Sequence, residues 1–177
     1  MYKRQYYFNP RFVISAAVAK SFRAPDATDL FGYAGNNKLN PEESRTSEIS
    51  IRYRVSSNES FASTLFHNKI TNLIESDGTK MQNINKARIN GFDISYVRYV
   101  NNKKFDIQYT YQEPKDKTNN VILSRRPRNR LINNITLFLK DAQTIGITAM
   151  YESSRDNSIY DANQLGGYVL VDANYTK

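Results

Sequence analysis

The sequence predicts an all-β protein of antiparallel strands, and three observations support that fold class. Apolar and polar residues alternate with a period of two in many segments of the 177 residues, which places them on opposite faces of extended strands. The connections between these segments alternate between short polar turns and long loops. Aromatic residues, which favour strands, are common: there are 13 Tyr and 9 Phe but only 7 Gly.

Eight segments show the alternation, and the clearest covers residues 105–112. There Phe105, Ile107 and Tyr109 are separated by single polar residues, so one face of the strand is apolar and the other polar. No segment shows a convincing helical period. In chain order the predicted strands are 12–18, 49–55, a weaker one at about 59–72, 92–96, 105–111, 131–139, 145–151 and 169–175.

The connections between these strands fall into two classes. Three are short and polar, with the composition of hairpin turns, at 56–58, 101–103 and 140–142. Four are long and hold most of the Pro, Asn, Gly and charged residues, at about 21–46, 73–86, 113–128 and 153–166. Short turns at one end and long loops at the other are typical of outer-membrane β-barrels. The longer strands also match the roughly 9–11 residues that a tilted strand needs to cross the hydrocarbon layer.

A soluble antiparallel β-sandwich, acting as a binding module, would show the same period of two and is the alternative fold. Two observations favour the membrane barrel. The longer strands exceed the roughly 5–6 residues usual in soluble sheets, and Tyr and Phe recur near strand ends, as in an interfacial aromatic girdle. The mean hydropathy of −0.65 agrees with a barrel whose lumen and loops are polar. No window approaches the roughly 18–20 apolar residues of a membrane-spanning helix.

No catalytic constellation is present, so we predict that the chain is not an enzyme. The absence of cysteine excludes a thiolate metal site, a disulfide framework and a cysteine nucleophile. His67 is the single histidine and has no motif partner for a metal site or a catalytic triad. The carboxylates Asp26, Asp29, Asp156 and Asp161 lack calcium-loop spacing. We therefore expect no cofactor and no bound metal.

The formal net charge is +8, and the sharpest concentration of positive charge is at residues 125–130, which contain four arginines. Such a cluster can contact nucleic-acid phosphates, the anionic groups of an outer-leaflet glycolipid, or an anionic ligand. The plainest alternative is a solvated strand entry that lines a polar lumen. Pro127 disfavours a continuous recognition helix, and no aromatic platform repeats nearby. The sequence therefore predicts contact with ligand or lumen and no nucleic-acid partner.

Four segments resemble TonB-dependent outer-membrane receptors, in the same order as in that family. The longest lies within 21–48 and contains SFRAPD, DLF and GNNKLNPEES. The others are NINKARINGFD at 83–93, LSRRP at 123–127, and LGGY at 165–168 followed by Val171 and Asp172. Within the family, the compact loops and the KARING and LSRR segments are most similar to the cobalamin receptors.

The resemblance implies a transmembrane β-barrel of 22 strands, plugged by an N-terminal domain, in the outer membrane of a Gram-negative bacterium. About eight of those strands would lie in this chain, as an incomplete fragment of the C-terminal half. The implied function is active import of cobalamin, driven by TonB, with a ferric siderophore as the alternative ligand. The implied partners are that ligand, TonB through an N-terminal part outside this chain, outer-membrane lipids and lipopolysaccharide.

The resemblance also implies ligand contacts. Cobalamin receptors place an arginine contact at the second Arg of the LxRR segment, which is Arg126 here. The loop at 153–166 aligns with a second ligand-contacting loop, in which Ser158 is the candidate. Ser124 and Pro127 depart from the commoner family residues, so the ligand stays open between cobalamin and a siderophore.

Elementary stereochemistry accounts for three positions in these segments. Pro25 fixes φ and turns the chain out of the preceding strand, and Pro41 biases Asn40 towards an extended conformation before the next strand. Gly91 removes side-chain bulk within a strand, which suits either a bulge or a close approach at the barrel wall.

Residues 1–5 are predicted to be foreign to the protein. The run MYKRQ is what the codons GTG-TAT-AAG-AGA-CAG would encode, and it resembles the end of a transposon adapter used in sequencing libraries. Residues 6–177 would then be a partial receptor barrel domain. The plug, the TonB box and the calcium-binding loops are expected upstream of it, and the last two strands downstream. No signal-peptide pattern follows Met1.

Overall fold

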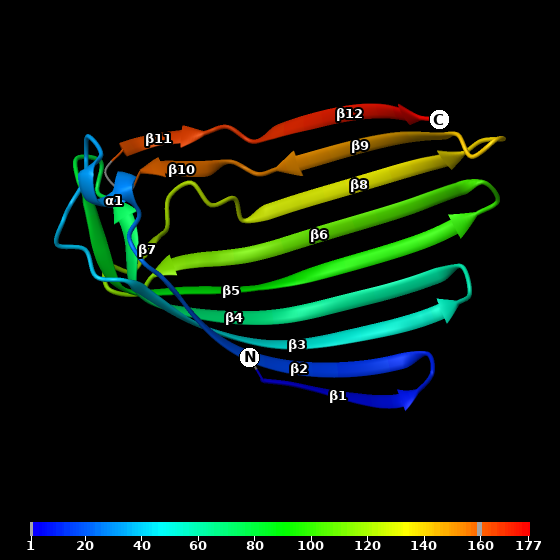
Figure 1. Cartoon of the computed structure of the whole chain (residues 1–177), viewed down its shortest axis with the longest axis horizontal. Helices are drawn as coiled ribbons and strands as arrows, with labels where there is room; N and C mark the ends of the chain where they lie inside the picture. The colour runs from blue at the N-terminus through cyan, green and yellow to red at the C-terminus, as the bar shows by residue number, and fades with distance from the viewer. Residues whose placement is uncertain (1, 159–160) are drawn as a thin grey trace.

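The computed structural model describes residues 2–158 and 161–177 and consists almost entirely of strands (Figure 1). The only helix in that part of the chain is α1 (Ala27–Phe31). The strands are β1 (Tyr2–Asn9), β2 (Phe12–Arg23), β3 (Glu42–Ser56), β4 (Glu59–Ser76), β5 (Met81–Val100), β6 (Lys103–Asp116), β7 (Val121–Ile122), β8 (Asn129–Phe138), β9 (Thr144–Glu152), β10 (Arg155–Ser158), β11 (Asp161–Leu165) and β12 (Tyr168–Thr176).

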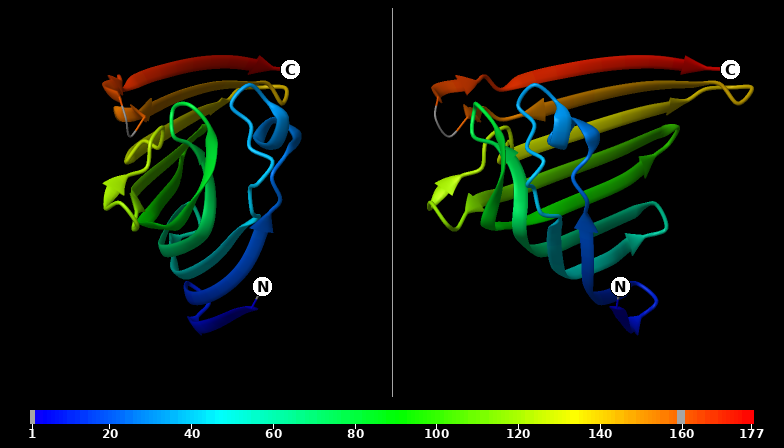
Figure 2. Two further views of the ribbon diagram at one scale, coloured as in Figure 1. Left: turned by 90° about the vertical axis from the view of Figure 1, so that its left-hand side faces the viewer. Right: turned by 60° about the vertical axis from the view of Figure 1, so that its left-hand side comes forward.

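One curved sheet forms the body of the molecule. Its strands pair in the order β1-β2-β3-β4-β5-β6-β8-β9-β12, with β7 beside β6, while β10 and β11 form a separate hairpin. All of these pairs are antiparallel. Strands β1 and β12 lie at opposite edges of an open arc (Figure 2). The predicted all-β, antiparallel fold class is therefore confirmed, as an unclosed sheet.

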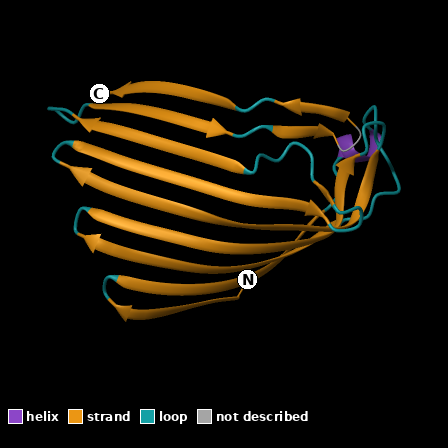
Figure 3. Ribbon diagram, turned by 180° about the vertical axis from the view of Figure 1, so that it is seen from behind, coloured by secondary structure: helices purple, strands orange, loops and turns teal. Residues whose placement is uncertain are grey.

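The two ends of the strands differ as the sequence predicts. Tight connections gather at one end and the longer ones at the other, beside α1 (Figures 1 and 3). The three predicted short turns are confirmed, and a fourth joins β1 to β2 at residues 10–11. Asn101, Asp141 and Ala142 in these turns adopt a left-handed backbone conformation, with φ of 52°, 56° and 60°. Asn and Asp tolerate that conformation better than other side chains do.

Two hairpins replace predicted loops at the long-loop end. Strands β4 and β5 stay paired from Glu59 opposite Arg98 up to Ser76 opposite Met81, so the expected loop at 73–86 is a hairpin closed by residues 77–80. The expected loop at 153–166 contains the β10–β11 hairpin. Backbone ladder bonds hold both extensions, and in the β4–β5 extension Leu73 and Ile74 are adjacent in sequence and both buried. Alternation of apolar side chains was therefore absent, and the prediction of loops was wrong there.

Strand β1, the short strand β7 and helix α1 were also not predicted. The expectation of no helix was wrong for Ala27–Phe31, because a helix of five residues is too short to show a helical period. Residues 2–5 lie in β1, paired with β2. Their foreign origin stays a prediction. No described helix is long and apolar enough to cross a bilayer.

The two faces of the sheet carry different side chains. Ile49 and Leu65 face each other across β3 and β4 and are 56% and 61% exposed. Register places the following side chains on the same side, here called the apolar face: Ile14, Ile49, Ile51, Leu65, Phe92, Ile94, Tyr109, Leu131, Ile135, Ile147 and Val171. An exposed, continuous apolar face on one sheet layer is the pattern of a membrane barrel wall.

The other side of the sheet, here called the polar face, is crossed by hydrogen bonds between adjacent strands. They join Ser50 to Thr64 (2.9 Å), Thr110 to Asp93 (2.6 Å) and Thr148 to Asn134 (2.8 Å). A soluble sandwich would cover its apolar face with a second sheet, and the described strands form no such second layer. The polar face corresponds to the lumen of a barrel.

The buried apolar cluster is small and lies at the long-loop end. It consists of Leu73, Ala87 and Leu123, with Ile70 and Ile84 packed against it. These residues come from β4, β5 and the segment that follows β7. The cluster therefore fixes the loops that form the candidate site.

Candidate functional site

The arginine-rich segment is anchored between strand β6 and the β10–β11 hairpin. Leu123 is 1% exposed, and its N–H donates to the carbonyl oxygen of Pro114 (2.9 Å). Arg125 has a φ of 56°, and its N–H donates to the carbonyl oxygen of Asp156 (2.7 Å). The Nε of Arg125 donates to the carbonyl oxygen of Asn157 (3.3 Å). This turn directs the next side chain, Arg126, towards the β4–β5 hairpin.

Arg126 forms a half-buried ion pair with Glu75 of β4. The Arg126 Nη1 to Glu75 Oε2 distance is 3.4 Å, and the two side chains are 29% and 19% exposed. Burial raises the pKa of Glu75; the Arg126 guanidinium opposes this shift, and the Asp116 carboxylate adds to it. Burial thus works against ionisation of Glu75, while the contact with Arg126 favours its charged form. A ligand oxygen can compete for the same guanidinium.

A pocket of about 240 Å³ adjoins Arg126. Arg126, Arg128 and Arg155 give it three cationic groups, whereas Asp156 is its single carboxylate. Asp156 already accepts a hydrogen bond from Gln164 Nε2 (3.1 Å). Such a pocket suits anionic or carbonyl oxygens of a ligand. The side chains that line it are Ile122, Arg126, Arg128, Ser154, Arg155, Asp156 and Gln164.

Arg155 extends the cationic wall of this pocket. Its guanidinium lies over the Tyr168 ring, 5.5 Å from the centroid, and its Nη1 is 3.6 Å from Glu152 Oε2. That buried Nη1 makes no hydrogen bond. Nothing in the sequence singled out Arg155, because it lies in a predicted loop far from the arginine cluster. The fold brings it to the pocket.

Ser158, the other predicted contact, is the last residue of β10. Its backbone pairs with Asp161 of β11, and its side chain lies outside what the structure describes. The hairpin that carries Ser158 does lie beside the arginine segment, because Asp156 bonds to Arg125. The structure thus brings together the two regions that the sequence proposed, and the ligand contact of Ser158 stays a prediction.

His67, Asp26 and Asp29 have structural partners, whereas the side chain of Asp161 lies outside what the structure describes. His67 Nδ1 lies 2.6 Å from Asn90 Oδ1 on the neighbouring strand. Asp26 caps α1 by accepting from the Asp29 N–H (2.8 Å). Within residues 2–158 and 161–177, no group of three or more His, Cys, Asp or Glu side chains could hold a metal ion.

The long connection at residues 24–41 is tied to the same hairpin as Arg126. Arg23 donates to Asp29 Oδ2 (2.8 Å) and to Glu42 Oε1 (3.1 Å), and the hydrogen bond to Glu42 is the largest cause of a raised pKa of Arg23. Glu42 Oε1 also accepts from the Ile74 N–H (2.7 Å). Further along, the Met81 N–H donates to the Ala34 carbonyl oxygen (2.7 Å). The connection at 24–41 and the β4–β5 hairpin therefore pack together, and Glu75 of the same hairpin pairs with Arg126.

Comparison with known proteins gives a family match over nearly the whole chain. The model described as TonB-dependent receptor-like β-barrel matches residues 2–176. The vitamin B12 transporters BtuB of Photobacterium profundum and Vibrio vulnificus are 26% identical over 170 residues and 27% identical over 169. Each match covers 90% of this chain but only 28% and 27% of the transporter. The chain thus spans less than a third of those relatives.

Solved structures show the same fold. A mutant of the ferric enterobactin receptor PfeA from Pseudomonas aeruginosa matches with a TM-score of 0.77 and 20% identity, over 96% of this chain and 31% of that one. The siderophore receptor PirA from Acinetobacter baumannii matches with a TM-score of 0.73 and 18% identity, over 97% and 33%. The copper transporter OprC matches with a TM-score of 0.76 and 16% identity, over 98% and 30%. At these identities the likeness concerns the fold alone.

Proposed function

The chain belongs to the TonB-dependent receptor family, and from that membership we propose that it forms part of the wall and outer loops of an outer-membrane importer. The exposed apolar face would contact lipid, and the polar face would line the lumen. The long-loop end, which carries the arginine pocket, would face the outside of the cell. The full-length receptor would bind its ligand there and import it with energy from TonB.

We propose cobalamin as the ligand of the full-length receptor. The two BtuB relatives, at 26% and 27% identity, and the LSRR segment support this choice. The observation that carries the site is Arg126, which is half-buried beside the pocket and paired with a carboxylate that burial discourages from ionising. Its guanidinium would donate hydrogen bonds to ligand oxygens. Ser158 would contribute from the adjacent hairpin.

A ferric siderophore is the second candidate, and the composition of the pocket favours it. Three arginines against one carboxylate suit a ligand with several anionic oxygens. Equilibrium binding of cyanocobalamin and of ferric enterobactin to the full-length receptor distinguishes the two. Saturable binding of cyanocobalamin at micromolar concentration supports the first proposal. Absence of that binding, with ferric siderophore uptake intact, would overturn it.

Arg126→Ala in the full-length receptor is expected to weaken binding of its ligand at least about tenfold, because a hydrogen bond to a charged group contributes about 1.5–3 kcal/mol. Isothermal titration of cyanocobalamin measures the change. Arg52→Ala is the matched control, since Arg52 is an exposed cation on the polar face near the short turns. Equal affinity of the Arg126→Ala variant and the wild type would show that Arg126 does not contact the ligand and serves only in its ion pair with Glu75.

A further inference from the structure

A row of cations crosses five adjacent strands. Lys20 of β2 lies directly opposite Arg45 of β3, and Arg45 lies opposite Lys69 of β4. Lys69 in turn lies opposite Arg88 of β5, and Arg88 lies opposite Lys115 of β6. We call these five residues the basic row. Because neighbouring strands are roughly 4.8 Å apart, the row extends over roughly 19 Å.

The basic row belongs to the apolar face and lies at its long-loop border. In β4, Lys69 follows Leu65 by four residues, and in β5, Arg88 precedes Phe92 by four. Side chains two or four residues apart in a strand share a face. The hydrogen-bonded pair of His67 and Asn90 (2.6 Å) lies between the row and the apolar residues. The cations therefore begin just beyond the apolar belt, on the side of the long loops.

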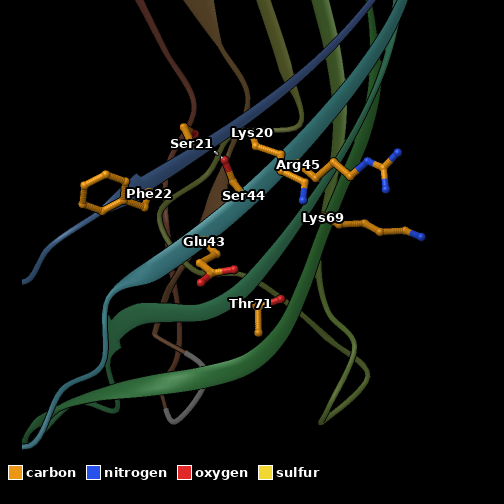
Figure 4. A pocket seen from close by; sticks show the side chains of 8 residues that line it. All are labelled: Lys20, Ser21, Phe22, Glu43, Ser44, Arg45, Lys69 and Thr71. Carbon is orange, nitrogen blue, oxygen red and sulfur yellow. Dashed lines mark hydrogen bonds between the residues drawn. The ribbon is translucent and has the colours of Figure 1, made fainter. Parts of the chain in front are cut away.

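Figure 4 shows the start of the row from close by. The side chains of Lys20, Arg45 and Lys69 leave three adjacent strands towards the same side. Ser21 and Ser44, one residue away from these cations along their strands, are hydrogen-bonded to each other (2.7 Å). A shallow pocket of about 530 Å³ lies along this part of the sheet.

The charges of the basic row are not neutralised within the described part of the chain. None of the five cations forms an ion pair with a described carboxylate within 4.0 Å. The acids on the same face that lie nearest the row are Glu43, two residues from Arg45 in β3, and Glu113, two residues from Lys115 in β6.

One further cation adds to this excess of positive charge, and the pairing of like charges across strands makes the excess unfavourable. Lys86, two residues from Arg88, is a further exposed cation, and its carbonyl oxygen accepts from the Lys117 N–H (2.7 Å). Like charges directly opposite each other destabilise a sheet. An external anion bound to the basic row would therefore relieve this repulsion.

We propose that the basic row binds the phosphate groups of glycolipid headgroups in the outer leaflet of the outer membrane. The apolar belt places the acyl chains against Leu65 and Phe92, so the headgroups of the same lipids reach the row. Several phosphates on one glycolipid would each bridge neighbouring cations. Arg45 and Arg88 offer bidentate donors to phosphate, and the lysines offer compact charges. This proposal depends on the membrane orientation of the wall and is independent of which ligand is imported.

The test uses the full-length receptor in detergent, titrated with lipopolysaccharide that retains its phosphates. The double variant Lys69→Gln/Arg88→Gln removes the centre of the row. Its matched control, Arg52→Gln/Arg54→Gln, removes two charges from the polar face near the short turns. Glycolipid retained per receptor is counted by native mass spectrometry. We expect the row variant to bind at least about tenfold more weakly, because charge-assisted phosphate contacts are lost, and the control variant to bind as the wild type does.

Two further arms identify the source of the phosphate. Dephosphorylated lipopolysaccharide should bind the wild type as weakly as intact lipopolysaccharide binds the row variant. Inorganic phosphate at millimolar concentration should not displace the intact glycolipid. Equal binding by the row and control variants, undiminished binding of dephosphorylated glycolipid, or displacement by inorganic phosphate would each overturn the proposal. Compact migration of both variants in unheated gels establishes that their barrels are folded, so a loss of binding is not a loss of fold.

Discussion

At Gly91 the neighbouring strands approach so closely that the sheet leaves no room for a side chain. It lies in β5 between Phe66 of β4 and Gln112 of β6. A Cβ at this position would overlap the Tyr111 carbonyl oxygen and the Phe66 ring. The register of β5 with both neighbours is unbroken at Gly91. Of the two roles predicted for this glycine, close approach is therefore confirmed and a bulge is not formed.

Gly91→Ala is expected to destabilise the full-length receptor by about 1–3 kcal/mol, because overpacking displaces neighbouring groups. The Phe66 ring can rotate, but the Tyr111 carbonyl belongs to the ladder and cannot move freely. Denaturant unfolding in detergent micelles measures the difference. Gly166→Ala is the control, since nothing lies within 4 Å of a Cβ there. Equal denaturation midpoints for the two variants would show that the neighbouring strands can shift to accommodate a Cβ at Gly91.

Among the elements, helix α1 illustrates how a short segment is held by its neighbours. A helix of five residues is unstable alone, because nucleation fixes several residues for few hydrogen bonds. Here Asp26 and Asp29 form a capping box, each carboxylate accepting from the other residue's N–H at 2.8 Å and 3.1 Å. Asp29 is 7% exposed and also binds Arg23. One carboxylate thus holds both the helix and the end of β2.

Asp29→Ala should release the connection at 24–41 without unfolding the sheet. Loss of the box and of the Arg23 contact removes about 1–3 kcal/mol locally. Hydrogen exchange at the Leu30 N–H, which bonds to the Asp26 carbonyl oxygen (3.1 Å), should accelerate, while exchange in β4 and β5 stays slow. Glu43→Ala, at an exposed site in the adjacent strand, should leave both unchanged. Unaltered exchange at Leu30 in the Asp29→Ala variant would contradict this role.

At the scale of the whole molecule, the open sheet exposes strand edges and an apolar face that water does not stabilise. Among the described residues, no strand pairs with the outer edge of β1 or β12, and no second layer covers the apolar face. Unpaired edges favour association with other chains, and a spanning sheet satisfies its backbone in lipid only by closing.

Residues 6–177 refolded without detergent are therefore expected to aggregate, because no described part of the segment covers the apolar face or the outer edges of the sheet. Sedimentation velocity measures the size distribution, and urea unfolding measures cooperativity. The same segment refolded in detergent micelles is the reference, and it should remain dispersed. A cooperative, detergent-free monomer would count against the membrane wall and in favour of a soluble module.

Much of the architecture could be predicted because alternation is a local property. In β6, Phe105, Ile107 and Tyr109 reveal their shared face without any knowledge of neighbouring strands. The extension of β4 and β5 beyond residue 72 could not be predicted, because Leu73 and Ile74 are consecutive and both buried, which breaks the period of two. The resemblance placed Arg126 near a ligand site. That ligand contact stays a prediction. Arg155 lines the same pocket as Arg126 only because the β10–β11 hairpin lies beside it.

The sequence by itself determined which face each strand residue occupies, since side chains alternate along any extended backbone. It also determined that short turns and long loops lie at opposite ends. Only the tertiary structure decided which residues of separate strands stand opposite one another. Lys20, Arg45, Lys69, Arg88 and Lys115 are scattered along the chain, and they form one row because the register of four strand pairs aligns them. Register depends on pairing between distant segments, which no local pattern encodes.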